Sequence, residues 1–116
     1  NLLDVDVYVA GHHGSDNGTT KALLAAVTPR IAILQTGDPS REEPWTAWAY
    51  GHPRVETIEA LETVLPLQRR QPRSGLVGRG AKSFEQRTVS AAIYATGWEG
   101  PIDIQLKANG DIVAEP

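Results

Sequence analysis

The sequence predicts an α/β protein in which a mixed sheet is flanked by helices, and three observations support this prediction. A β-branched and aromatic run near the start ends at a glycine, an apolar helical pattern follows, and a continuous apolar run comes next. This order is typical of two parallel strands joined by a helix. Near the end of the chain, residues 88–95 predict one strand, and residues 101–107 alternate between apolar and polar. A type I′ turn at Asn109-Gly110 is predicted to join this second strand to an antiparallel strand at residues 111–114. With 116 residues, the chain can bury one modest core and forms no more than one domain.

The first predicted strand starts at Val5 and is followed by Gly11-His12-His13-Gly14-Ser15. Imidazole is the commonest protein metal ligand and titrates near physiological pH, so this histidine pair is suited to binding a metal or transferring a proton. Adjacent residues on an extended segment point in opposite directions, and we expect at most one of the two to contact a metal directly. The alternative is that both rings make the ordinary hydrogen bonds of a turn.

A helix is predicted for residues 21–27, since Leu23, Leu24 and Val27 share one helical face after a cluster of capping residues. Its first amides could bind an anion beside the histidines, or the end could simply be capped. Residues 31–34 form the continuous apolar run of a strand buried on both faces. Asp38 follows this strand within Gly-Asp-Pro, a turn signal that we favour over a metal role.

The next segment, residues 41–50, is predicted to be a loop that carries Trp45, Trp48 and Tyr50. These rings could form a wall against a substrate, or they could close the core beneath the loop. A helix is predicted after it, with Pro53 at the first helical position. His52 could point toward the same cleft as the tryptophans or cap this helix.

The segments described so far, together with Gly37 and Tyr50-Gly51-His52-Pro53, resemble the later part of a metallo-β-lactamase-fold hydrolase. They are most similar to the branch that includes the hydrolase domain of the ComEC/Rec2 DNA-internalisation proteins. The resemblance covers about the first two-thirds of the chain. It implies a fold made of half of an αββα sandwich, and a hydrolase of phosphoester or phosphodiester bonds that works through a metal-activated water.

The resemblance also implies roles for individual residues. In that family the His-His-Gly-Ser block supplies the last histidine ligand of a metal centre that is usually binuclear, and the metal expected here is zinc or manganese. The family register gives the ligand role to His13 and a neighbouring, catalytic and substrate-facing role to His12, although the two could be exchanged. Ser15 would steady an anionic oxygen of the substrate. His52, Trp45 and Trp48 are candidate substrate-binding residues.

The family's first ligand cluster, an HxHxDH or HxDxDH motif, and its metal-bridging aspartate lie upstream of this block and are not in this sequence. We therefore expect residues 1–116 to be the C-terminal portion of a single metallo-β-lactamase-like domain. Such a portion would be inactive alone, because one protein ligand cannot hold a catalytic metal. Its expected partners are the missing N-terminal half or another copy of the chain, and its substrate is a phosphate ester or a nucleic acid.

Residues 66–87 differ in character from the rest, with six basic residues, a single acid and several glycines. The pattern predicts a flexible basic insertion where the family usually has a short turn. Its arginines could bind phosphates. The alternative that we favour is a solvated loop or a contact with the missing acidic half of the fold.

Composition limits the remaining possibilities. The net charge of −3 argues against a dedicated nucleic-acid-binding protein. The absence of cysteine excludes a disulfide framework and a thiolate metal site. No run in the sequence is long and apolar enough to cross a bilayer. The alternative function is a non-catalytic binding or assembly module with the same fold.

Overall fold

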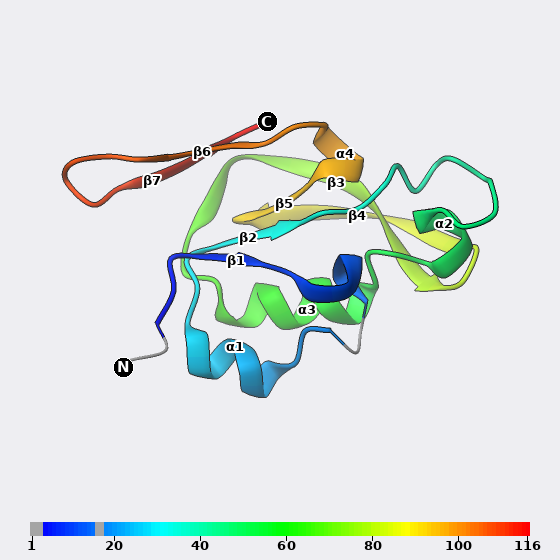
Figure 1. The fold of residues 1–116 in the computed structure, drawn as a ribbon, viewed down its shortest axis with the longest axis horizontal. Coiled ribbons are helices and arrows are strands. Elements are labelled where there is room, and N and C mark those ends of the chain that lie inside the picture. The colour runs from blue at the N-terminus through cyan, green and yellow to red at the C-terminus, as the bar shows by residue number, and fades with distance from the viewer. Residues whose placement is uncertain (1–3, 16–17) are drawn as a thin grey trace.

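The computed structural model describes residues 4–15 and 18–116. At its centre is a three-stranded parallel sheet with strand order β1-β2-β5, formed by Val7–Val9, Ile31–Leu34 and Ile93–Ala95. Helices α1 (Lys21–Val27) and α3 (Val55–Val64) cover one face of this sheet (Figure 1). The hairpin of β6 (Asp103–Leu106) and β7 (Ile112–Glu115) lies over the other face.

The unit β1–α1–β2 confirms the predicted strand, helix and parallel strand. The two strands pair in parallel register from one end of β1 to the other. The hydroxyl of Thr20 caps α1 by accepting a hydrogen bond from the amide of Leu23 at 3.1 Å. Simple capping, the second of the two sequence interpretations, therefore describes this helix start.

The sheet buries apolar side chains on both faces. On the helical face, the core includes Leu24, Leu34, Ile58, Leu61 and Ile93, all fully buried. On the other face, a smaller cluster of Ile31, Ile33, Ala92 and Tyr94 packs against Ile112 and Ala114 of β7. Burial on both faces explains why β2 reads as a continuous apolar run rather than as an alternating one.

The segment expected to be a loop at residues 41–50 ends in a short helix, α2 (Ala47–Tyr50), which is capped by Thr46. The prediction that Pro53 occupies the first position of the next helix is wrong, because α3 begins at Val55 with Arg54 as its N-cap. Pro53 instead packs directly on Gly14, and the amide of Arg54 donates a hydrogen bond to the Gly14 carbonyl at 2.9 Å. These contacts join the histidine segment to the start of α3.

Where the sequence indicated a flexible loop at residues 66–87, the structure has a long antiparallel hairpin of β3 (Gln68–Gly80) and β4 (Ser83–Ala91). The glycines that suggested a loop instead allow close packing. A Cβ atom on Gly75 would lie 2.6 Å from the ring of Trp98, and one on Gly78 would lie 2.0 Å from the carbonyl oxygen of Gly51. That this hairpin is an insertion relative to the resembled family stays a prediction.

The C-terminal strands also differ from the expectation. Residues 88–95, predicted as one strand, are divided between β4 and β5, which belong to different sheets, and α4 (Thr96–Glu99) follows β5. The turn between β6 and β7 is not type I′, which needs a positive φ at both central residues. Only Gly110 in that turn has a positive φ, of 90°, and its amide bonds to the carbonyl of Lys107 at 2.9 Å.

The predicted mixed sheet is thus a parallel sheet accompanied by two separate antiparallel hairpins. The α/β class agrees with the prediction, and the half-sandwich of the metallo-β-lactamase fold stays a prediction. Within the described residues, no helix has the length and apolar character needed to span a membrane.

Candidate functional site

A pocket of about 550 Å³ lies where the segments that follow β1 and β2 meet the loop before α3. We call it the histidine pocket. Its lining residues are His13, Gly37, Asp38, Arg41, Trp45, Thr46, Ala47, Tyr50 and His52. Three of the residues predicted from the sequence, His13, His52 and Trp45, are therefore brought together here. The carboxyl ends of parallel strands are where α/β folds place ligands.

His13 is held in a defined orientation at the end of the short 3₁₀ helix Gly11–Gly14. Its Nδ1 lies 2.7 Å from the carbonyl oxygen of Gln35, the residue that follows β2. Because a carbonyl can only accept, Nδ1 is the donor, and in the neutral tautomer that makes this bond the lone pair lies on Nε2. Metal-binding histidines are commonly oriented by this kind of hydrogen bond to a main-chain carbonyl. His13 also has a φ of 54°, a conformation that few residues other than glycine adopt.

A row of aromatic rings extends from His13 across the pocket. The centroids of His13 and His52 are 6.5 Å apart, those of His52 and Tyr50 are 6.0 Å apart, and those of Tyr50 and Trp45 are 6.3 Å apart. The side chain of Trp45 is 86% exposed, so it does not close the core beneath the loop. Trp45 and Tyr50 therefore line the histidine pocket, and their role as a wall against a substrate stays a prediction.

Trp48 does not line the histidine pocket. It is half-buried at the β3–β4 turn, where the ammonium of Lys82 lies 5.5 Å from its ring centroid and the Lys82 amide bonds to its carbonyl at 2.9 Å. Trp48 therefore packs beneath the loop, against the turn between β3 and β4. His52 lines the pocket, and the N-cap position of α3 belongs to Arg54, so the cleft interpretation of His52 fits the structure.

Two charged residues complete the pocket. The carboxylate of Asp38 accepts hydrogen bonds from the hydroxyl and the amide of Ser40, at 2.6 and 2.9 Å. These bonds hold the pKa of Asp38 below its usual value, so it stays a carboxylate that closes a turn. The guanidinium of Arg41 is exposed and lies 3.1 Å from the carboxylate of Glu43. Sequence reasoning did not select Arg41, although its position shortly after a strand end could have indicated it.

Of the two predicted catalytic residues, Ser15 lies outside the histidine pocket, and the side chain of His12 is not among those that the structure describes. Ser15 is 5% exposed and does not line the pocket, and its carbonyl accepts a hydrogen bond from the Thr57 hydroxyl at 3.0 Å. Its location gives no support to the predicted contact with substrate. The side chain of His12 lies outside the described part of the structure.

The described residues can supply one ligand to a metal ion, but not a complete coordination sphere. No group of three or more histidine, aspartate or glutamate side chains within residues 4–15 and 18–116 could hold an ion. His13, with its Nδ1 bonded to Gln35, fits the role of a single nitrogen ligand. The other ligands would come from outside these residues.

Over 51 residues, the chain is 37% identical to Recombination protein 2 of Haemophilus influenzae. The aligned part covers 44% of this chain but only 6% of that protein. No family model matches the chain. No solved structure matches it either. The similarity supports the relation to this group of proteins that the sequence motifs indicate.

Proposed function

We propose that this chain is part of a metal-dependent hydrolase that cleaves phosphoester or phosphodiester bonds. The observation that carries the proposal is the hydrogen bond from His13 Nδ1 to the Gln35 carbonyl. It fixes the tautomer that leaves Nε2 with a lone pair, on a ring that lines a 550 Å³ pocket. Such a ring can bind a metal without further rearrangement.

In this proposal His13 holds a divalent ion, zinc or manganese, together with ligands from outside the described residues. The ion would supply Lewis-acid chemistry for the attack of water on the phosphorus. Arg41 attracts the anionic substrate and orients its phosphate oxygens, since a guanidinium offers several donors in one plane. Trp45, Tyr50 and His52 contact the substrate, and the rings of Trp45 and Tyr50 cover its apolar part.

His12 is assigned a substrate contact and proton donation by its register next to His13. The remaining metal ligands would come either from a preceding segment of the same protein or from a second copy of this chain. Because the chain spans a small share of its relative's length, the activity is proposed for the complete protein and not for residues 1–116 alone.

The test uses the complete protein that contains this segment, with bis(p-nitrophenyl) phosphate as substrate. We expect hydrolysis that needs zinc or manganese and is lost on treatment with a chelator. Arg41→Ala should raise KM about tenfold with a smaller change in kcat, because it removes a charge-assisted contact to the anion. Arg79→Ala is the control, since this exposed arginine pairs with Glu85 on the hairpin and does not line the pocket.

Two results would contradict the proposal. Hydrolysis that persists after chelation would exclude the metal-dependent mechanism. Binding of the phosphodiester without any hydrolysis, in protein loaded with metal, would instead favour the non-catalytic binding module.

A further inference from the structure

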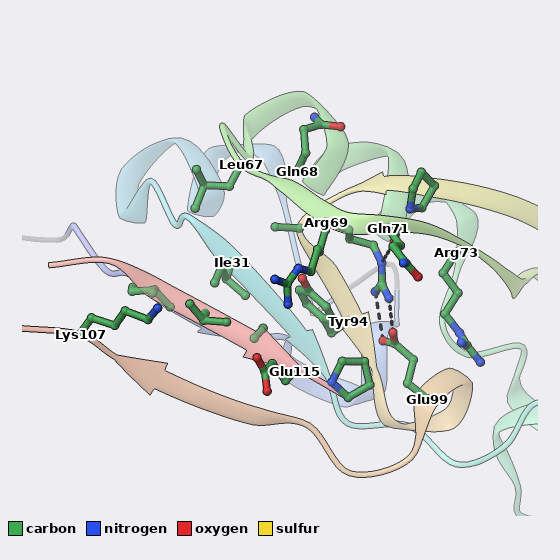
Figure 2. A pocket seen from close by; sticks show the side chains of 17 residues that line it. Ile31, Leu67, Gln68, Arg69, Gln71, Arg73, Tyr94, Glu99, Lys107 and Glu115 are labelled. Atoms are coloured by element: carbon green, nitrogen blue, oxygen red, sulfur yellow. Dashed lines mark hydrogen bonds and ion pairs between the residues drawn. The ribbon is translucent and has the colours of Figure 1, made fainter. Parts of the chain in front are cut away.

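A second pocket, of about 670 Å³, is lined by residues of the smaller core cluster, on the face of the sheet opposite α1 and α3. We call it the strand groove. Figure 2 shows β3 along one side of it, β7 along the other, and side chains of β2 and β5 between them. The floor is apolar and includes Ile31, Ala92 and Ile112. Its volume lies within the usual range of ligand pockets, roughly 300–1,000 Å³.

The rim of the strand groove is basic although the whole chain carries a net charge of −3. Its lining includes four basic residues, Arg69, Arg70, Arg73 and Lys107, and two acidic ones, Glu99 and Glu115. Arg69 is neutralised by its buried pair with Glu99. Among the described residues, exposed Arg70 and Lys107 form no ion pair, and the Arg73 guanidinium is hydrogen-bonded to the uncharged carbonyl of Trp98. Figure 2 shows Lys107 and Arg73 at opposite ends of the groove.

One side of the groove is a free strand edge. In the β6–β7 hairpin, the amide of Lys107 bonds to the carbonyl of Asp111 at 2.8 Å. Hydrogen-bonded and non-hydrogen-bonded pairs alternate along an antiparallel ladder, so the pairs that contain Ile112 and Ala114 are non-hydrogen-bonded. The main-chain N–H and C=O groups of these two residues therefore point away from β6. β7 has no second strand partner among the described residues.

The opposite side of the groove is formed by β3, whose pairing with β4 is interrupted there. Gln68 of β3 pairs with Ala91, and the next register pair joins Arg73 to Val89. Residues 69–72 thus bulge out of the ladder, and Arg70 lies within this bulge. A bulge bends the strand and exposes main-chain groups that the ladder does not use.

We propose that the strand groove binds an extended acidic peptide segment, which adds as a strand to the free edge of β7. The main-chain groups of Ile112 and Ala114 pair with the peptide, and alternate apolar side chains of the peptide cover the groove floor. Acidic side chains of the peptide face Arg70, Arg73 and Lys107. A single-stranded nucleic acid fits less well, since Tyr94, the one aromatic residue of the lining, is 6% exposed beneath Arg69 and offers no surface for base stacking.

The proposal is tested by fluorescence polarisation with the 116-residue chain and a labelled peptide of alternating glutamate and valine, seven residues long. We expect saturable binding of this peptide and none of its lysine–valine counterpart. N-methylation of every second amide removes donors along one edge while keeping charge and side chains, and it should weaken binding at least about tenfold.

Substitutions in the chain locate the site. Arg70→Glu and Lys107→Glu should each weaken peptide binding by about tenfold through charge repulsion. The control Lys21→Glu reverses an equally exposed charge on α1 and should change nothing. Ala114→Pro should abolish binding, because proline removes the outward N–H while the bonds to β6 are kept. If that variant misfolds, Arg70→Glu still tests the site.

Four results would overturn the proposal. They are no binding at millimolar peptide, equal loss in Lys21→Glu, equal binding of the N-methylated peptide, and tighter, Arg70-dependent binding of a single-stranded oligonucleotide. The third result would leave only a general anion site, and the fourth would make the groove a nucleic-acid site.

Discussion

Arg69 at the start of β3 forms a buried ion pair with Glu99 at the end of α4, and the two side chains are 6% and 0% exposed. The pair is also bonded to the main chain of β5. Arg69 donates to the carbonyl of Ile93 at 2.7 Å, and Glu99 accepts from the amide of Ala95 at 3.2 Å. The guanidinium lies 4.3 Å from the ring centroid of Tyr94, and burial raises the pKa of that phenol. The pair thus connects the long hairpin to the central sheet.

Removing one partner of this pair should be costly. Glu99→Ala leaves the Arg69 guanidinium buried without its counter-charge, and we expect a loss of about 3–5 kcal/mol in the free energy of unfolding. The control is Glu85→Ala, which breaks the exposed pair between Arg79 and Glu85 and should cost less than about 1 kcal/mol. Urea denaturation of the two variants measures both. Equal losses would show that the buried pair contributes no more to the free energy of unfolding than the exposed pair does.

The contact of Gly14 with Pro53 predicts a second stability difference. Gly14 has a φ of 80°, and an added Cβ would lie 2.8 Å from the Pro53 Cβ. Gly14→Ala should therefore cost roughly 2–5 kcal/mol, from backbone strain and overpacking together. Gly100 has a similar φ of 76° with open space around it, so Gly100→Ala isolates the strain and should cost only about 1–2 kcal/mol. Thermal unfolding of both variants gives the comparison, and a smaller loss for Gly14→Ala would refute the steric argument.

Limited proteolysis distinguishes the observed hairpin from the flexible loop that the sequence indicated. Trypsin should cut first after Lys82, an exposed turn residue with a φ of 60°, and after Lys107 in the β6–β7 turn. Arg69 and Arg87 should be protected, since they lie in strands and pair with Glu99 and Glu62. Mass spectrometry of early fragments identifies the sites. First cuts at Arg69, Arg70 or Arg73 would restore the loop interpretation.

The sequence predicted those elements whose signals are local. The helix 21–27 and the strand 31–34 follow from periodicity and a continuous apolar run, and their parallel pairing follows from the order of the elements. The hairpin β3–β4 was missed because its glycines read as breakers. No side chain fits at Gly75 or Gly78, because Trp98 and the Gly51 main chain pack against them. Such contacts between distant segments leave no local pattern in the sequence.

The candidate site was predictable to a similar extent. His13, His52 and Trp45 carry chemistry recognisable from residue type, and the structure places them around one pocket. Trp48 carried the same signal yet packs beneath the hairpin turn, and Ser15 is buried. Which side of a loop faces a pocket is decided by tertiary packing, so a sequence pattern cannot separate Trp45 from Trp48.

The exposed side of β1 predicts association. Val9 of β1 is 50% exposed, and by strand alternation it shares a face with Val7, which packs against the smaller core cluster. Val5, which precedes the strand, is 37% exposed. β1 is also an edge strand. Sedimentation of the isolated chain should show self-association, and Val9→Lys should reduce it, whereas Leu23→Lys on α1 should not. A stable monomer that binds no hydrophobic dye would contradict this prediction.

The last prediction concerns the two adjacent histidines in the complete protein. His13→Ala removes the ring that Gln35 orients, and it should lower both metal content and turnover, since the ligand contributes to metal affinity and to water activation. His12→Ala should leave metal content near normal and lower turnover by about a hundredfold or more, the usual effect of losing a catalytic acid or base. Metal analysis of the purified variants by mass spectrometry, beside their rates, separates the two roles. Metal loss in His12→Ala alone would show that the ligand register is displaced by one residue. If both variants keep metal and activity, the segment after β1 is only a turn, and the hydrolase proposal fails at its central residue.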